Sequence, residues 1–209
     1  HQPPPLRRQR QMCIRDRTIV DQVITVNGAT TVDNANLLAA TTTGKLTATI
    51  ATTETVTELA TLSADGGTND LTIVIRAADA TVSTAAQLNT INAATALAVD
   101  LTNVTALAGS SLSDLETLAS AINANEFSND SGLTTIAVTD TTIDATTLAS
   151  TIDSYDAIGG TTDMTLVSGA TINVDAGEIT EMLTDESAGS LTIVDLSLIH
   201  ISEPTRQIR

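Results

Sequence analysis

The chain has 209 residues, of which 25 are acidic and 9 are basic, so its formal net charge is −16, and Cys13 is its only cysteine. A charge this negative repels the phosphates of nucleic acids and of anionic membrane surfaces, which argues against both as partners. No apolar run approaches the ~18 residues of a membrane span, and a single cysteine excludes an intramolecular disulfide.

The two ends of the chain differ in composition from everything between them. Segments 1–17 and 196–209 hold both histidines, the cysteine, all prolines and every basic residue except Lys45 and Arg76. The amino-acid sequences of residues 7–17 and 196–206 resemble in-frame translations of the adapters used to build shotgun DNA libraries. This resemblance implies that both segments are processing scars. We therefore expect 1–17 and 196–209 to lie outside the fold, although the apolar stretch 196–201 could extend a terminal strand, and 18–195 to form the acidic folded region.

Short β-prone runs recur along 18–195. Each run is continuously apolar or alternates, as a strand with at least one buried face does. After a first run at 18–26, the runs begin 25 to 36 residues apart, at Leu46, Leu71, Leu97, Leu133, Met164 and Leu191.

A short helix is predicted between most of these strands. A Thr or Ser beside an aliphatic residue, followed by a short polar step, marks the helix start, because the oxygen of a polar side chain there accepts from a free backbone N–H. The examples are Thr31-Val32-Asp33, Thr55-Val56, Thr81-Val82-Ser83, Ser111-Leu112-Ser113, Thr142-Ile143-Asp144 and Thr171-Ile172-Asn173. Apolar residues three or four apart then mark the helix. The clearest set is Leu112, Leu115, Leu118 and Ile122, with Ser113 or Asp114 as the cap. Weaker pairs are Leu59 with Leu62, Leu88 with Ile91, Leu148 with Ile152, and Ile179 with Met182.

This alternation predicts an α/β solenoid of stacked repeats, about six coils long, in which short parallel strands alternate with short helices. Matching strand positions should then be buried together, namely Ile73, Val99, Ile136, Leu166 and Ile193. Phe127 and Tyr155 are the only aromatic residues, which favours thin aliphatic layers over one deep core. The alternatives are an all-β sandwich array and a disordered Thr-rich stalk, and the helix-period segment at 112–122 argues against the sandwich.

The region 18–195 contains no histidine and no cysteine. This excludes Ser-His-Asp and Cys-His catalysis and His- or Cys-ligated zinc. We predict no catalytic, cofactor-binding or metal-binding residue. Asp140, Asp144, Asp153 and Asp156 are expected to act as caps or solvated groups, and Arg76 to pair with a nearby Asp. Oxygen-rich turns at 65–70 and 123–130 are possible calcium ligands, but neither has the EF-hand spacing, and capping of neighbouring backbone explains both.

The phrases Thr139–Leu148 and Val104–Gly109 resemble the repetitive regions of giant adhesin-like surface proteins of marine bacteria. The resemblance implies secretion, an extracellular or cell-surface location, and a non-catalytic structural or adhesive role, with extracellular polymers as possible partners. A calcium- or carbohydrate-binding module of such a protein is the alternative function. A polysaccharide-acting enzyme on a β-helix is a third hypothesis.

Overall fold

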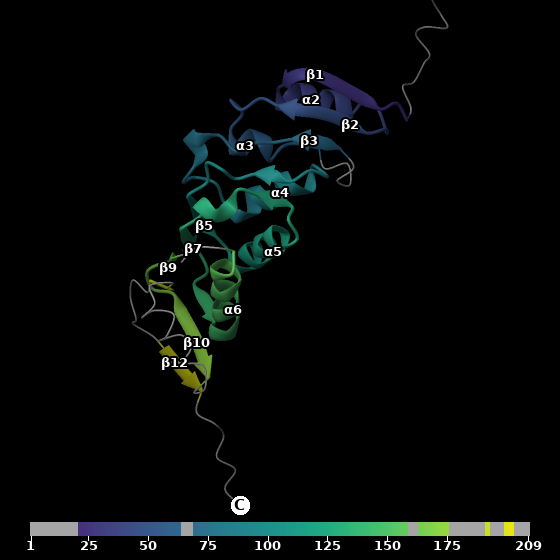
Figure 1. Cartoon of the computed structure of the whole chain (residues 1–209). Helices are drawn as coiled ribbons and strands as arrows, with labels where there is room; N and C mark the ends of the chain where they lie inside the picture. Colours follow the sequence, from purple (N-terminus) through teal and green to yellow (C-terminus); the bar gives the residue numbers. More distant parts are fainter. Residues whose placement is uncertain (1–20, 64–68, 159–162, 176–190, 193–198, 203–209) are drawn as a thin grey trace, which may run out of the picture.

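The computed structural model describes residues 21–63, 69–158, 163–175, 191–192 and 199–202. Their helices and strands follow one another in chain order along the long axis of an elongated molecule, from β1 (Ile24–Thr30) at one end to β12 (Ile199–Ser202) at the other (Figure 1). The expected mixture of short helices and short parallel strands is therefore confirmed.

In the N-terminal half, β1 is followed by α2 (Val32–Ala39), β2 (Leu46–Ile50), α3 (Val56–Leu59), β3 (Asp70–Thr72), the 3-10 helix η1 (Ala77–Asp79) and α4 (Ala85–Ala93). The chain continues with β4 (Val99–Asp100), β5 (Ala106–Ser110), α5 (Leu112–Asn123), β6 (Phe127–Ser128), η2 (Asp130–Gly132), β7 (Thr135–Val138), β8 (Thr142–Asp144) and α6 (Ala145–Asp156). Beyond α6 come β9 (Asp163–Leu166), β10 (Thr171–Asp175), β11 (Leu191–Thr192) and β12.

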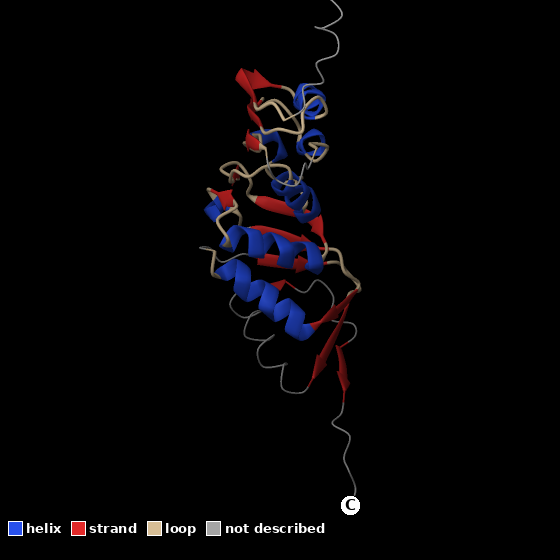
Figure 2. Ribbon diagram, turned by 90° about the vertical axis from the view of Figure 1, so that its right-hand side faces the viewer, coloured by secondary structure: helices blue, strands red, loops and turns tan. Residues whose placement is uncertain are grey.

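All the strand pairs in the described part of the chain are parallel. They form four small sheets, with the orders β1-β2-β3, β11-β9-β7-β5, β12-β10-β8 and β4-β6. Figure 2 shows the helices beside these strands, one beyond another along the axis. An all-β sandwich is therefore the wrong alternative for these residues, since sandwiches are built from antiparallel strands without interleaved helices.

The expected pairing order needs correction at β3 and β4. These strands are joined only by one isolated bridge between Val74 and Asp100, and β4 pairs with β6 rather than with β7. Strand β7 instead pairs with β5 on one side and with β9 on the other. Strands β5, β6, β8 and β10 were not predicted from the sequence, because each is short or contains Ala, Gly, Ser, Asn or Asp, residues that carry no strong strand signal.

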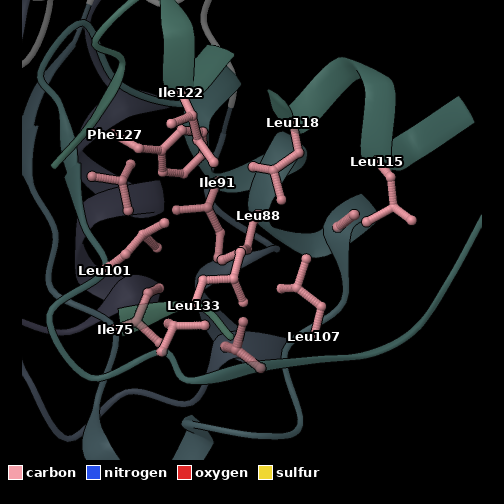
Figure 3. Close-up of a cluster of buried hydrophobic side chains, with 14 of the residues drawn as sticks. Ile75, Leu88, Ile91, Leu101, Leu107, Leu115, Leu118, Ile122, Phe127 and Leu133 are labelled. Atoms are coloured by element: carbon pink, nitrogen blue, oxygen red, sulfur yellow. The ribbon is translucent and has the colours of Figure 1, made fainter. Parts of the chain in front are cut away.

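The expected core residues are buried, with one error of register. Ile73, Val99, Ile136 and Leu166 are all buried, whereas Ile193 lies outside the described residues. Ile136 lies opposite Met164, so Leu166 belongs to the next row, opposite Val138. The core runs through the molecule as one cluster, and its middle part is formed by apolar residues of α4, α5 and the adjoining segments (Figure 3).

Side-chain caps begin the helices, as expected for Thr31, Thr55 and Asp144. The cap of α5 is Ser111 instead of Ser113 or Asp114, because the buried Leu112 already belongs to the first turn. Helix α4 is capped by Thr84, three residues beyond the expected start. The predicted helix through Leu59 and Leu62 ends at Leu59, and the one at 179–182 lies outside the described residues.

Part of the C-terminal segment joins the fold. Strand β12, within 196–209, pairs in parallel with β10, so that Ile172 lies opposite Ile199. This corrects the expectation that the whole segment lies outside, and it matches the allowance that its apolar stretch extends a terminal strand. Segment 1–17 lies outside the described residues. Among the described residues, no helix has the length and apolar character needed to cross a membrane.

Candidate functional site

The helix N-termini are joined to the following part of the chain by a recurring contact. The first helical N–H has no partner within its own helix. In four helices a side chain 22 to 28 residues further on accepts its hydrogen bond. We use the word unit for a stretch of 22 to 28 residues that comprises a strand, the corner after it and the following helix. Each contact therefore links one unit to the next.

The acceptors differ in chemistry but occupy the same place. The N–H of Val32 donates to Glu54 Oε2 at 3.4 Å, that of Val56 to Asp79 Oδ2 at 2.7 Å, that of Ala85 to Ser110 Oγ at 2.9 Å, and that of Leu112 to Asp140 Oδ2 at 2.8 Å. A negative or partly negative oxygen is favoured here, because the backbone dipoles of a helix leave its N-terminus positive. We call these four contacts the interlocking caps.

Asp79 has the densest set of contacts of the four acceptors. Its side chain is almost completely buried, and its carboxylate also accepts from Arg76 Nε at 2.9 Å and Nη2 at 3.1 Å. Arg76 Nη1 in turn donates to the carbonyl of Thr53 at 3.1 Å. The expected pairing of Arg76 with a nearby Asp is therefore confirmed. The same Asp also caps the helix of the preceding unit, a contact that the sequence did not predict.

Amide and hydroxyl side chains add further links between units. Asn36 Nδ2 donates to the carbonyl of Thr61, and its Oδ1 accepts from the N–H of Ser63. Thr95 Oγ1 accepts from the N–H of Leu71 at 2.9 Å, and the buried Asn69 Oδ1 accepts from the N–H of Leu46 at 3.0 Å. Because these atoms lie 23 to 27 residues apart, each bond holds neighbouring units in register.

The oxygen-rich turns have structural partners where they are described. Residues 64–68 of the turn at 65–70 lie outside the described part, and Asp70 pairs with Lys45 at 2.5 Å. In the turn at 123–130, Glu126 Oε2 accepts from Asn92 Nδ2 at 2.6 Å, and Asn129 Nδ2 donates to Asp100 Oδ1 at 3.0 Å. Among the described residues, no cluster of three or more His, Cys, Asp or Glu side chains converges as a metal site would.

Asp140, Asp144, Asp153 and Asp156, which were expected to act as caps or solvated groups, have different surroundings. Asp140 is an interlocking cap, and Asp144 caps its own helix by accepting from the N–H of Thr147 at 3.0 Å. Asp153 and Asp156 lie exposed in the last turns of α6. Capping and solvation therefore account for the positions of these side chains, as the sequence predicted.

A hollow of about 390 Å³ lies between α4 and α5. Its polar lining links the two helices: Asn89 Nδ2 donates to the carbonyl of Asp114 at 2.9 Å, and Asn92 binds Glu126. Asn89 Oδ1 is buried there without a hydrogen-bond partner among the described residues. The remaining lining residues are Ala93, Thr117, Ser120, Ala121 and Ala124.

In the described part of the chain, the pKa values of Asp100, Glu58 and Tyr155 are shifted. Burial raises the pKa of Asp100, but hydrogen bonds from Thr102 and Asn129 outweigh this effect and leave the pKa below its ordinary value of 3.8. Hydrogen bonds from the backbone and side chain of Thr55 lower the pKa of the fully exposed Glu58. Burial raises the pKa of Tyr155, whose hydroxyl donates to the carbonyl of Leu115 at 2.9 Å.

The interlocking caps can transmit force from one unit to the next, because each bond joins a helix end to the neighbouring corner. A sequence signal for them exists: Glu54 and Ser110 stand directly before the next helix cap, and Asp79 and Asp140 stand a few residues before it. Comparison of the chain with protein-family models, with curated proteins and with solved structures finds no match.

Proposed function

We propose that the chain is a non-catalytic structural segment of a large extracellular or cell-surface protein. In this proposal the units stack as a solenoid, and the stack acts as a load-bearing spacer. The observation that carries the proposal is the series of interlocking caps, which joins each of four helices to the unit that follows it.

Three further features support a spacer. The helices and strands succeed one another along one long axis (Figure 1). The parallel strand pairs and the side-chain links repeat the connection between neighbours along that axis. In a stack of this kind stability is a sum over units and their interfaces, so the molecule can be long without one deep core. The high net negative charge of the chain favours solubility at a cell surface.

Single-molecule pulling of the full chain from its two ends tests the proposal. A stacked spacer should extend in steps, each releasing one unit of 22 to 28 residues. At ~3.5 Å per extended residue, each step adds roughly 80–100 Å. Ser110→Ala removes one interlocking cap and should lower the force of a single step, whereas the exposed Ser113→Ala should leave every step unchanged.

A single cooperative event would contradict the spacer. If residues 21–158 unfold together, the added length is roughly 480 Å in one step. That result would describe one globular domain, in which a binding or catalytic role is the better hypothesis.

A further inference from the structure

Large apolar side chains are exposed at the N-terminal end of the described part of the chain. We call the N-terminal face the surface formed by Val23, Ile24, Val26, Thr30 and Leu37. Val23 is 68% exposed and Leu37 is 65% exposed, while Ile24 and Val26 are only partly buried. Strand β1 has a partner on one side alone among the described residues, and it lies at the end of the molecule (Figure 1).

Within the described part of the chain, the backbone groups on one edge of β1 have no strand partner. The N–H of Ile24 donates to the carbonyl of Lys45, and the carbonyl of Thr30 accepts from the N–H of Ala51. Because the direction of the backbone groups alternates along a strand, the neighbouring residues Thr25 and Ala29 direct theirs at the opposite edge. A further parallel strand would satisfy these groups.

Thr30 matches Ser110 in place and in surroundings. Each is the last residue of its strand, stands directly before a helix cap, and follows a shift in strand register. Both are turned inward, with 9% of Thr30 and 3% of Ser110 exposed. Ser110 Oγ accepts from the N–H of Ala85, which begins the helix of the preceding unit. The hydroxyl of Thr30 has no such partner among the described residues.

We propose that the N-terminal face is a docking surface for one more strand–helix unit of the same build. Its strand lies parallel to β1, and its first helical N–H donates to Thr30 Oγ1. The argument for this occupant is continuity: β1-β2-β3 is already a parallel ladder, and Glu54, Asp79, Ser110 and Asp140 already make the contact assigned to Thr30. The docked unit also covers Val23 and Leu37. This inference rests on the proposed stacking of units.

A duplication tests the docking. One unit spans residues 24–45, since Ile24 lies opposite Leu46 in the register. A second copy of 24–45 is inserted between Val23 and Ile24 of the full chain, which places the copied Val32 above Thr30. Hydrogen exchange of single amides is compared with that of the parent chain. We expect the original Thr25 and Ala29 amides to exchange at least ~10-fold more slowly, because they now lie inside a ladder.

A matched pair of variants isolates the cap. Thr30→Val keeps the branched shape but removes the acceptor, so the amide of the copied Val32 should exchange several-fold faster. Thr49→Val makes the same change on an exposed position of β2, opposite Ala29 and on the side of β1 that is already paired, and should have no effect on that amide.

Two results would overturn the inference. The first is that the original Thr25 and Ala29 amides exchange as fast as in the parent chain, which would show that the added unit is undocked. The second is that the two Thr→Val variants have the same effect on the copied Val32 amide, which would show that Thr30 makes no cap. If the chain extends stepwise under force but the copy is undocked, the docking inference is wrong and the proposed spacer function stands. One-step extension would defeat the spacer itself.

Discussion

The middle of the molecule and its N-terminal strand and helix differ in how completely their apolar side chains are buried. Leu88 of α4 and Leu115 of α5 are completely buried, because units on both sides cover them (Figure 3). Ile24 of β1 and Leu38 of α2 are only partly buried, because a described neighbour covers them on one side alone. Burial of an apolar side chain therefore depends both on its place in its own helix and on the neighbours around it, since Val32 and Ala35 of the same helix α2 are as well buried as the residues of the middle.

The hydrogen-bond lengths of the interlocking caps also differ between the middle and the N-terminal end. The three caps toward the middle, from Asp79, Ser110 and Asp140, have lengths of 2.7 to 2.9 Å, whereas the cap from Glu54 to the first helix is 3.4 Å long. A hydrogen bond weakens as its length grows beyond the usual range. The N-terminal unit should therefore be the first described unit to open.

The largest expected effect comes from truncating a middle leucine. Leu115→Ala should lower the free energy of unfolding by ~3–5 kcal/mol, because it leaves a cavity in a fully buried layer. Leu38→Ala, in the partly buried terminal unit, should cost roughly 1 kcal/mol. Urea denaturation measures both values. Equal losses would show that the two regions are packed alike and would remove the basis of the comparison.

Removal of the Asp79 carboxylate should be the next largest effect. Asp79→Ala leaves the N–H of Val56 and the guanidinium of Arg76 without their partner, which should cost roughly 2–4 kcal/mol. Asp33→Ala is the matched control, since Asp33 is an exposed acid in the first turn of α2 and contributes at most ~0.5 kcal/mol. Urea denaturation again gives the free energies. A loss below that of the control would mean that Asp79 does not hold its two units together.

The interlocking caps can be compared directly by hydrogen exchange. Ser110→Ala leaves the buried N–H of Ala85 without an acceptor and should reduce local stability by ~1–2 kcal/mol at α4. Glu54→Ala removes the longer bond to Val32 and should cost less than ~0.5 kcal/mol at α2. The reverse order would contradict the proposed weakening of the contacts toward the N-terminal end.

The smallest effect is a pH dependence at Asp100, which joins β4 to the turn at Asn129. The pKa of Asp100 lies below its ordinary value of 3.8, so the folded state favours the carboxylate. The contribution of the Asp100 carboxylate to the free energy of unfolding is therefore present above the pKa that Asp100 has in the unfolded chain, and it is lost as the pH falls through the folded pKa. The free energy of unfolding of the wild type should exceed that of Asp100→Asn by less than ~1 kcal/mol at about pH 6, and the two values should converge as the pH falls below the folded pKa of Asp100. A difference that persists in acid would show that the hydrogen bonds do not depend on the charge.

Short-range patterns in the sequence were sufficient to predict two helix caps, one helix and one ion pair. Thr31 and Thr55 cap helices as predicted, because a cap depends only on residues three positions apart. The apolar spacing at Leu112, Leu115, Leu118 and Ile122 predicted α5, since it reports one buried face of a helix. The pairing of Arg76 was predicted because acids are abundant and cations are rare in this chain.

The strand partners and the interlocking caps, which join residues more than 20 positions apart, were decided by the tertiary structure alone. The strand partners of β4 and β7 and the row of Leu166 follow from corner lengths, which differ from unit to unit and shift the register. The same holds for the interlocking caps: the sequence shows that Asp79 and Ser110 are polar and near a helix start, but not that they reach the helix before it. Local propensity acts over a few residues, whereas these contacts exist only after folding has brought together residues that lie 22 to 28 positions apart in the chain.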